Sequence, residues 1–287
     1  MHPRVAGAIE EIRSDRTHGA SFLARRAINT IALAAALSDT KRVSGVMAEA
    51  RVAAQALLAA RPTMVAIGNS VVRYLYELQQ EAAGASSPSE LASLAQAKAA
   101  EMVEASARAV ESIAGHAKAL IGPGDIVITC SYSSTVCDVL AACKPVRVVA
   151  VESRSGDVAY GEIMAERLRA GGLAVEVVPD ADLAKAARGA TKAVLGADSI
   201  LADGSVVNGA PSLELAQAAK AADLPLHVVS ETNKFSMGGH GELEPGFQRL
   251  PAAFVTRIVT EEGPLDPSEV RRIAARLEEY YRAFDLG

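Results

Sequence analysis

The 287-residue sequence contains no tryptophan, and aromatic residues make up only 4% of it. Its three cysteines, Cys130, Cys137 and Cys143, form no CxxC pair and have no histidine cluster beside them, which argues against a zinc site. An odd number of cysteines without a signal peptide fits a reducing compartment, so we expect a cytoplasmic protein. No uninterrupted apolar run reaches the length that a membrane helix needs, so no membrane role is expected.

The sequence also lacks an excess of positive charge. Lysine and arginine number 29 against 34 aspartate and glutamate residues, a net charge of −5. A protein that holds nucleic acid through bulk charge needs a positive surface, so direct binding to nucleic acid is not expected. What the sequence does have is hydrophobic residues, 50% of the chain and many of them alanine. That is enough for the core of one large domain or two smaller ones.

The first part of the chain has the pattern of helices. Apolar residues recur at helical spacing from Val5 onward. Cap-forming residues and prolines predict breaks at 38–40, 61–63 and 84–88. An alanine-rich helix is predicted from about residue 89 to about residue 120.

The pattern changes at Gly122-Pro123-Gly124-Asp125. Strands are predicted at 126–129, 146–151, 175–178, 193–195, 226–229 and 258–260, and helices at 135–142, 159–170, 181–187, 213–221 and 265–284. Strands that alternate with helices imply a parallel sheet covered on both faces. The sequence therefore predicts an α/β protein, with an N-terminal helical domain (1–122), a C-terminal Rossmann-like parallel-sheet domain (123–287) and a ligand cleft between them.

Two polar residues stand where an open parallel sheet holds its ligands, outside the carboxyl ends of the strands. Asp198 follows the predicted strand 193–195. Asn208 belongs to Asn208-Gly209, which we interpret as a tight turn, as we do Asp203-Gly204. Asp198 and Asn208 are therefore candidate ligand contacts, or turn residues that bond to their own backbone.

The segment 129–135, Thr-Cys-Ser-Tyr-Ser-Ser-Thr, follows a predicted strand and opens a helix. Backbone N–H groups at a helix start, with hydroxyls beside them, form an anion-binding site that suits phosphate. The alternative is that these serines only cap the helix.

Several blocks of the sequence resemble the signature of one superfamily. They are Gly196-Ala197-Asp198, Asn208, and Glu231-Thr232-Asn233-Lys234-Phe235. The superfamily contains the alpha, beta and delta subunits of translation initiation factor 2B. It also contains two sugar-phosphate isomerases, which act on methylthioribose-1-phosphate and ribose-1,5-bisphosphate. The order and spacing of the blocks agree along most of the chain.

Three further blocks resemble the family's phosphosugar site. They are Arg16-Thr17-His18-Gly19-Ala20, with His18 in place of an arginine, Arg61-Pro62-Thr63, and Glu152-Ser153-Arg154, with Ser155 in place of a proline. The resemblance implies a set of ligand contacts: Arg16, His18, Gly19, Ala20, Arg61, Ser131, Ser133, Ser134, Arg154, Asn208 and Lys234. Taken alone, each cation would fit a solvated surface role.

The position of the cysteine separates the two branches of this family. In the isomerases the segment resembles Thr-His-Cys-Asn-Ser, and its cysteine works with the aspartate of Gly-Ala-Asp. Here Cys130 takes the histidine position and Ser131 the cysteine position. Neighbouring residues on an extended segment point to opposite faces, and a serine hydroxyl has no useful acidity near neutral pH. Gly209 also stands where the family has the lysine of Asn-Lys.

The resemblance therefore implies a regulatory protein like the initiation factor 2B subunits, which binds a phosphorylated sugar or nucleotide without metal or organic cofactor. The alternative is an aldose–ketose isomerase of a sugar 1-phosphate, with Asp198 as acid/base and Cys130 as a displaced catalytic thiol. A third is a structural subunit with a vestigial cleft. The resemblance also implies a homodimer or a larger homo-oligomer.

Overall fold

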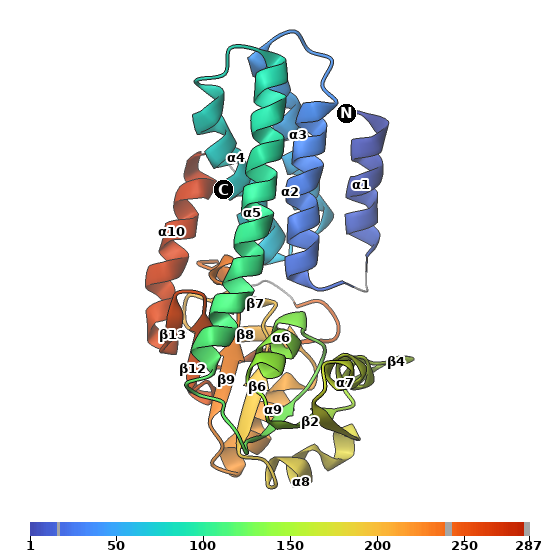
Figure 1. Cartoon of the computed structure of the whole chain (residues 1–287), viewed down its shortest axis with the longest axis vertical. Helices are drawn as coiled ribbons and strands as arrows, with labels where there is room; N and C mark the ends of the chain where they lie inside the picture. The colour runs from blue at the N-terminus through green and yellow to red at the C-terminus, as the bar shows by residue number, and fades with distance from the viewer. Residues whose placement is uncertain (16–17, 239–242, 284–287) are drawn as a thin grey trace. The chain divides into compact units, whose positions relative to one another are not determined.

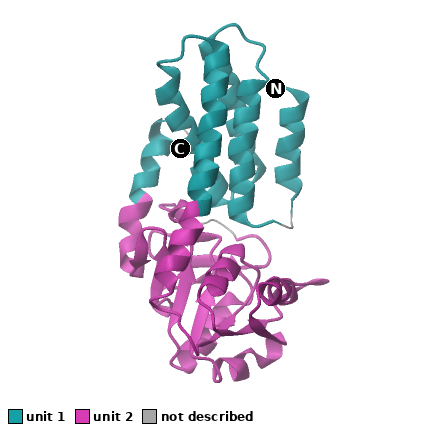
Figure 2. Cartoon of the chain, in the orientation of Figure 1, with its two compact units in different colours: residues 1–107, 275–287 teal, residues 108–274 magenta. Residues whose placement is uncertain are grey.

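The computed structural model describes residues 1–15, 18–238 and 243–283 (Figure 1). It divides into two compact units, residues 1–107 together with the chain from 275 onward, and residues 108–274 (Figure 2). The sequence placed the boundary near residue 122, whereas the units divide within a long helix, after residue 107, and again within the last helix, after residue 274. The ligand cleft expected between the two domains stays a prediction.

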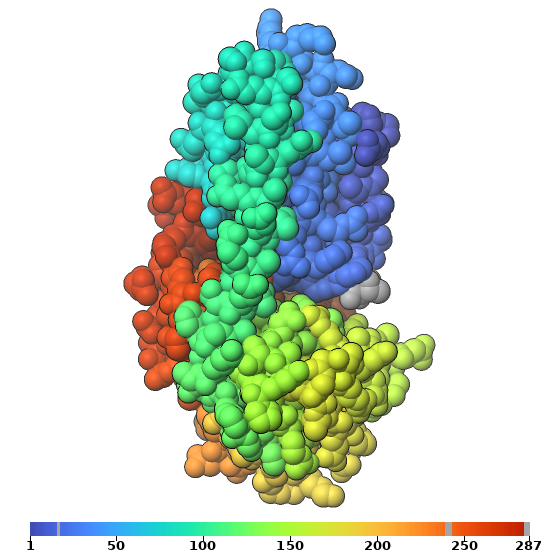
Figure 3. Space-filling model, in the orientation of Figure 1, coloured from blue at the N-terminus to red at the C-terminus, as the bar shows by residue number. Residues whose placement is uncertain are grey.

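The first unit is helical, as the sequence predicted. Its helices are α1 (Pro3–Ser14), α2 (Ala20–Ala36), α3 (Val43–Ala60), α4 (Val65–Ala82) and the first part of α5 (Pro88–Ala117). Their buried faces are rich in alanine, including Ala27, Ala50 and Ala53, which are fully buried. Small side chains let the helices pack closely, and α2 contacts α1, α3 and α4. Figure 3 shows α5 on the surface of the face that is drawn.

Helix α3 qualifies the expectation that no segment could span a membrane. Within the described residues it is the one helix whose length and composition would suffice, with 18 residues at a mean hydropathy of 1.2. It carries Glu49 and Arg51, and it contacts α1, α2 and α4. Val46 and Leu57 are buried among these helices. One face of α3 packs in the bundle, and 33% of the 18-residue stretch is buried.

The second unit is built on a seven-stranded sheet in the order β13-β12-β9-β6-β1-β2-β5. Its strands are β1 (Ile126–Thr129), β2 (Arg147–Val151), β5 (Ala174–Val178), β6 (Lys192–Leu195), β9 (Leu226–Val229), β12 (Arg257–Thr260) and β13 (Gly263–Leu265). All neighbours pair in parallel except β12 and β13. The α/β fold is confirmed, and every strand predicted from the sequence is present.

Helices connect the parallel strands. They are α6 (Ser134–Ala142), α7 (Tyr160–Ala170), α8 (Leu183–Ala187) and α9 (Ser212–Ala221), and α10 (Val270–Ala283) closes the chain. One core cluster joins the C-terminal part of α5 and helix α6 to the sheet, with Ile113, Val136 and Val194 fully buried in it. A capping box between Asp266 and Glu269 precedes α10. Short 3-10 turns lie at Asp180–Asp182, Thr232–Lys234, Ala252–Phe254 and Pro267–Glu269.

A second, four-stranded sheet was not predicted. Its order is β10-β7-β8-β11, formed by β7 (Ser199–Leu201), β8 (Val206–Gly209), β10 (Phe235–Ser236) and β11 (Phe247–Leu250). Asp203-Gly204 lies between the antiparallel strands β7 and β8, and Gly204 has a φ of 79°, so this turn is confirmed. The turn expected at Asn208-Gly209 is wrong, because both residues lie in β8 and pair with β11.

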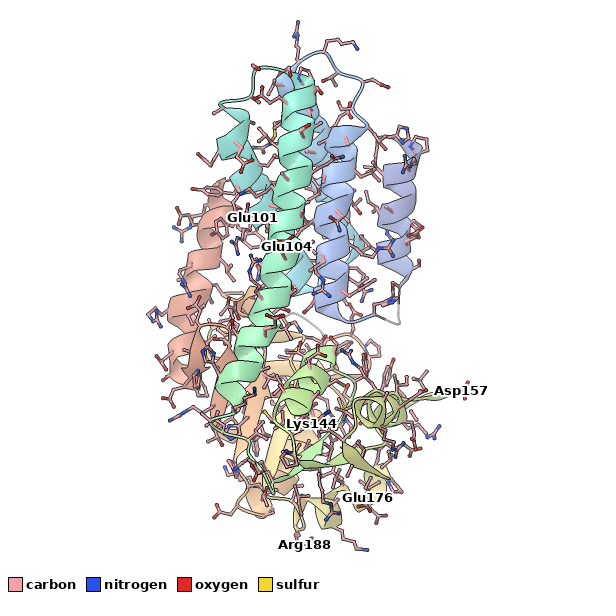
Figure 4. The ribbon with its side chains drawn as sticks, viewed as in Figure 1. Glu101, Glu104, Lys144, Asp157, Glu176 and Arg188 are labelled. Carbon is pink, nitrogen blue, oxygen red and sulfur yellow. The ribbon has the colours of Figure 1, made fainter. Side chains whose placement is uncertain are left out.

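A small hairpin follows β2. It consists of β3 (Arg154–Ser155) and β4 (Val158–Ala159), which pair antiparallel. Asp157, in the connection between them, projects away from the rest of the unit (Figure 4). The hairpin carries Arg154, one of the residues expected to contact ligand.

Candidate functional site

The candidate site lies where the strand order reverses. From β1 the chain proceeds to β2 and β5 on one side, and then to β6, β9 and β12 on the other. Ligands of open parallel sheets bind at this reversal, outside the carboxyl ends of the strands. The loops that follow β1 and β6 flank the reversal and carry residues 130–133 and 196–198. Ser131, Ser133 and Asp198 lie at this edge of the sheet, where the sequence predicted them, and their contact with ligand stays a prediction.

Two glycines make room for the serines after β1. A Cβ atom built on Gly196 would lie 2.5 Å from the Ser133 Oγ, and one on Gly209 would lie 2.5 Å from the Ser131 Oγ. A side chain at either position would displace the hydroxyl. The lysine that the resembling family has at the position of Gly209 is absent here. Its Cβ atom would lie in the space that the Ser131 hydroxyl occupies.

Hydrogen bonds fix the conformation of the loop after β1. Ser131 has a φ of 60°, and its N–H donates to the Ser153 Oγ at 2.7 Å. Ser153, with a φ of 52°, donates its own N–H to the Asp180 Oδ1 at 2.7 Å and its hydroxyl to the Val151 carbonyl at 3.0 Å. Positive φ is disfavoured for side chains other than glycine, so these bonds hold both loops in place.

Helix α6 begins in this loop. Ser133 is its N-cap and accepts the N–H of Val136 at 3.3 Å, and Ser134 is the first helical residue. The capping role considered for these serines is therefore confirmed for Ser133. The first turn of α6 also presents backbone N–H groups, which favour an anion. Both Ser133 and Ser134 are half-buried, so their side chains remain in contact with solvent.

Cys130 is directed into the protein. Its side chain is 2% exposed, and its Sγ lies 3.5 Å from the Ser212 Oγ at the start of α9. Ser212 donates its hydroxyl hydrogen to the Gly209 carbonyl at 2.6 Å and accepts the Asn208 amide at 2.8 Å. A serine hydroxyl has one hydrogen to donate, so Cys130 must be the donor in the bond to Ser212. In this arrangement the Cys130 sulfur carries the hydrogen of the bond to Ser212.

Burial also raises the pKa of the Cys130 thiol to about 12. A thiolate is the reactive form of cysteine, and a raised pKa removes it at neutral pH. Asn208 lies in the same hydrogen-bonded group, is 5% exposed, and directs its amide to the Ser212 side chain. Its expected contact with ligand stays a prediction.

Lys234 is buried against the carbonyl of Ala197, the residue that precedes Asp198. Its side chain is 6% exposed, and its Nζ donates to the Ala197 carbonyl at 2.8 Å. The N–H of Asp198 donates to the Val207 carbonyl at 2.9 Å, and its side chain is half-buried. The solvated role considered for each cation alone is wrong for Lys234. A buried ammonium needs compensating contacts, and the Ala197 carbonyl supplies one of them.

Arg154 follows β2 at the same edge of the sheet. Its N–H donates to the Asp180 Oδ2 at 3.1 Å, and its guanidinium forms an ion pair with Glu152. The side chain is exposed. Sequence reasoning missed Asp180, which holds the backbone of both Ser153 and Arg154. A signal for it existed, because Asp180 lies two residues after the predicted strand 175–178.

Two of the expected contacts in the helical unit, Arg61 and His18, bond to Asp15. Arg61 is 9% exposed and donates to the Asp15 carbonyl at 2.8 Å. The His18 N–H and its Nδ1 lie 2.9 and 2.8 Å from the Asp15 carboxylate, and the ring stacks on Phe22. Gly19 is the N-cap of α2, whose first residue, Ala20, is buried. Arg16 lies outside the described residues.

The described part of the chain contains no group of three or more histidine, cysteine, aspartate or glutamate residues that could hold a metal ion. The groups that carry the candidate chemistry are the helix start, the buried lysine, Asp198 and the serine hydroxyls.

Comparison with known proteins gives relatives from two functional classes. A translation initiation factor eIF-2B subunit 2-like protein of Pyrococcus furiosus is 29% identical over 237 residues, covering 81% of this chain and 79% of the relative. A ribose 1,5-bisphosphate isomerase of Haloterrigena turkmenica is 27% identical over 305 residues, covering 93% of this chain and 92% of the relative. Overall similarity therefore does not separate the two classes.

Solved structures share the fold. A chain of the tetrameric eIF2B-beta2-delta2 complex from C. thermophilum has a TM-score of 0.80 at 21% identity, and the match covers 95% of this chain and 94% of that one. The 5-methylthioribose 1-phosphate isomerase of Pyrococcus horikoshii OT3 has a TM-score of 0.77 at 19% identity, with 96% and 87% coverage. At these identities the likeness concerns the fold alone.

A family model described as the initiation factor 2 subunit family, IF-2B, matches residues 16–242. That range contains the strand-end loops of the candidate site and most of the helical unit. It also contains the blocks from which the resemblance was first inferred. The chain belongs to the initiation factor 2 subunit family.

Proposed function

We propose that this protein binds a phosphorylated sugar or nucleotide at the reversal of strand order and acts as a regulatory member of its family, without efficient turnover. One observation carries the proposal. The Cys130 thiol is 2% exposed and donates to Ser212, while Ser131 stands where the resembling isomerases have cysteine. A protonated, buried thiol is a poor acid–base group for isomerisation.

The charges at the sheet edge support phosphate as the bound group. The start of α6 supplies backbone N–H groups with the hydroxyl of Ser134. Lys234 supplies a positive charge beside the loop after β6. A doubly charged phosphate would satisfy both, and Asp198 would accept a hydrogen bond from a sugar hydroxyl.

Calorimetric titration with ribose-1,5-bisphosphate tests the proposed anion site. Lys234→Met should weaken binding by about 10- to 100-fold, because it removes a hydrogen bond to a charged group. Lys220→Met, at an exposed position of α9, is the matched control and should bind like the wild type. Equal affinity in the wild type and Lys234→Met would reject the site.

A second variant covers the case in which Lys234→Met does not fold. Ser134→Asp places a negative charge in the first turn of α6, where the helix dipole stabilises it, so the fold should be retained. The added charge repels phosphate and should also weaken binding. Circular dichroism confirms folding of each variant before titration.

The alternative is an aldose–ketose isomerase of a sugar 1-phosphate. Similarity to the ribose 1,5-bisphosphate isomerase of Haloterrigena turkmenica, together with the presence of Asp198, favours it. Such an enzyme moves a proton between C1 and C2, with Asp198 and Cys130 as the candidate groups. Turnover of ribose-1,5-bisphosphate or methylthioribose-1-phosphate that disappears in both Asp198→Asn and Cys130→Ser would establish the enzyme and overturn the regulatory proposal.

We also propose a homodimer or larger homo-oligomer in the cytosol. The eIF2B-beta2-delta2 complex of C. thermophilum is tetrameric, which supports an assembly of related chains. The net charge of −5 supports the absence of direct nucleic-acid binding. Light scattering across the micromolar range measures the assembly, and a monomer at every concentration would reject it.

A further inference from the structure

A groove between α8 and α9 shares only Arg154 with the ligand contacts expected from the sequence. Its volume is about 560 Å³, within the range of roughly 300–1,000 Å³ that small-molecule sites occupy. Most of its wall is aliphatic, with Leu183 and Ala184 from α8 and Ala218 and Ala221 from α9. Pro211 adds to this wall, so the groove offers an apolar body a place to bind.

The rim of the groove is acidic. It carries Asp180, Glu214 and Arg154. The guanidinium of Arg154 is already neutralised by an ion pair with Glu152, so the two rim carboxylates dominate the local charge. An anion entering the groove would face both carboxylates, whereas an organic cation would be attracted.

Both rim carboxylates can still accept hydrogen bonds. Asp180 receives the N–H groups of Ser153 and Arg154, one on each oxygen, and Glu214 receives the side-chain amide of Gln248. A carboxylate has about four lone-pair sites, so each of these groups has capacity left for an ammonium.

The groove is physically connected to the loop after β1. Asp180 lines the groove and holds the Ser153 N–H at 2.7 Å. The Ser153 hydroxyl in turn accepts the N–H of Ser131, also at 2.7 Å. Ser131 and Ser153 both have positive φ, so their conformations depend on these bonds. A ligand that contacts Asp180 would act on the Ser131 loop through two hydrogen bonds.

We propose that the groove between α8 and α9 binds a small organic cation with an aliphatic or aromatic body, and that its occupation stabilises the loop after β1 through Asp180 and Ser153. The apolar wall would contact the apolar body of the ligand, and the acidic rim would contact its positive charge. This site goes beyond the proposed phosphate site and would regulate it, since the coupled loop precedes α6.

Three probes of one shape test the charge preference: cyclohexylmethylammonium, cyclohexylmethanol and cyclohexanecarboxylate, titrated by ligand-observed NMR at pH 7.5. The ammonium should bind about five-fold tighter than the alcohol, because exposed ion pairs contribute up to about 1 kcal/mol, and the carboxylate should bind least. Equal binding of all three probes would overturn the assignment. None contains phosphate, so the outcome is independent of the proposed phosphate site.

Blocking variants test the location. Ala218→Phe fills the groove and should abolish ammonium binding, and Ala221→Phe serves if the first variant does not fold. Ala100→Phe, at an exposed position of α5, is the matched control and should bind normally. Binding that survives both groove substitutions in folded protein would place the cation elsewhere and overturn the proposal.

Amide hydrogen exchange tests the connection. Saturating cyclohexylmethylammonium should slow exchange in the peptide that contains residues 130–134. The effect should be absent in the groove-blocked variant and present in Ala100→Phe. Binding at the groove without any change in this peptide would overturn the coupling.

Discussion

The three cysteines give a direct test of the inference that Cys130 is not a catalytic thiol. Burial raises its pKa from an ordinary 9.0 to about 12. Three pKa units correspond to a thiolate population about a thousandfold smaller than that of an exposed cysteine. Since only the thiolate attacks a disulfide reagent, the folded protein should react much more slowly than the unfolded chain.

The other two cysteines should behave in the same way. Burial raises the pKa of Cys137 to about 11, and it raises the pKa of Cys143 as well. We therefore expect the native protein to show no rapidly reacting thiol toward Ellman's reagent at pH 7.5, and three in guanidinium chloride. Mass spectrometry of a slower alkylation then assigns the order of reaction.

A matched variant makes the assay decisive. Ser131→Cys places a thiol on the half-buried neighbour of Cys130, at the position where the resembling isomerases have cysteine. It should add one reactive thiol to the native protein. Rapid labelling of wild-type Cys130, at the rate of the unfolded chain, would refute the reasoning, because the thiol would then open readily to solvent.

Two further predictions concern stability. Burial, together with the positive charges of Lys192 and Arg257, lowers the pKa of His227 from 6.5 to about 4. Below pH 6.5 the unfolded chain therefore binds a proton at His227 that the folded protein does not bind. The free energy of unfolding should therefore fall by up to about 3 kcal/mol between pH 6.5 and pH 4. Urea titrations of His227→Gln should lack this part of the pH dependence. An identical pH dependence in that variant would contradict the assignment. Gly161→Ala would bring a Cβ to 2.0 Å from the carbonyl oxygen that ends β2, at a cost of about 3 kcal/mol. Gly115→Ala, with open space in α5, is its control and should stabilise by about 0.5–1 kcal/mol in thermal unfolding.

The sequence by itself determined the large sheet. Each strand from β1 to β12 in that sheet is a short apolar run, and each is separated from the next by a segment with helical or turn residues. These patterns are local, so they can be recognised without knowing what the strand pairs with. The same pattern placed Ser133 and Asp198 at strand ends, because parallel strands present their carboxyl ends to one edge.

Only the tertiary structure decided the small sheet and the environment of the site. Asn208 has the sequence signature of a turn, yet it pairs with Gln248 in β11, forty positions along the chain. Burial raises the pKa of the Cys130 thiol, and Lys234 is buried against the Ala197 carbonyl. Pairing and burial between residues distant in sequence leave no local pattern, since they depend on what the fold places beside each side chain.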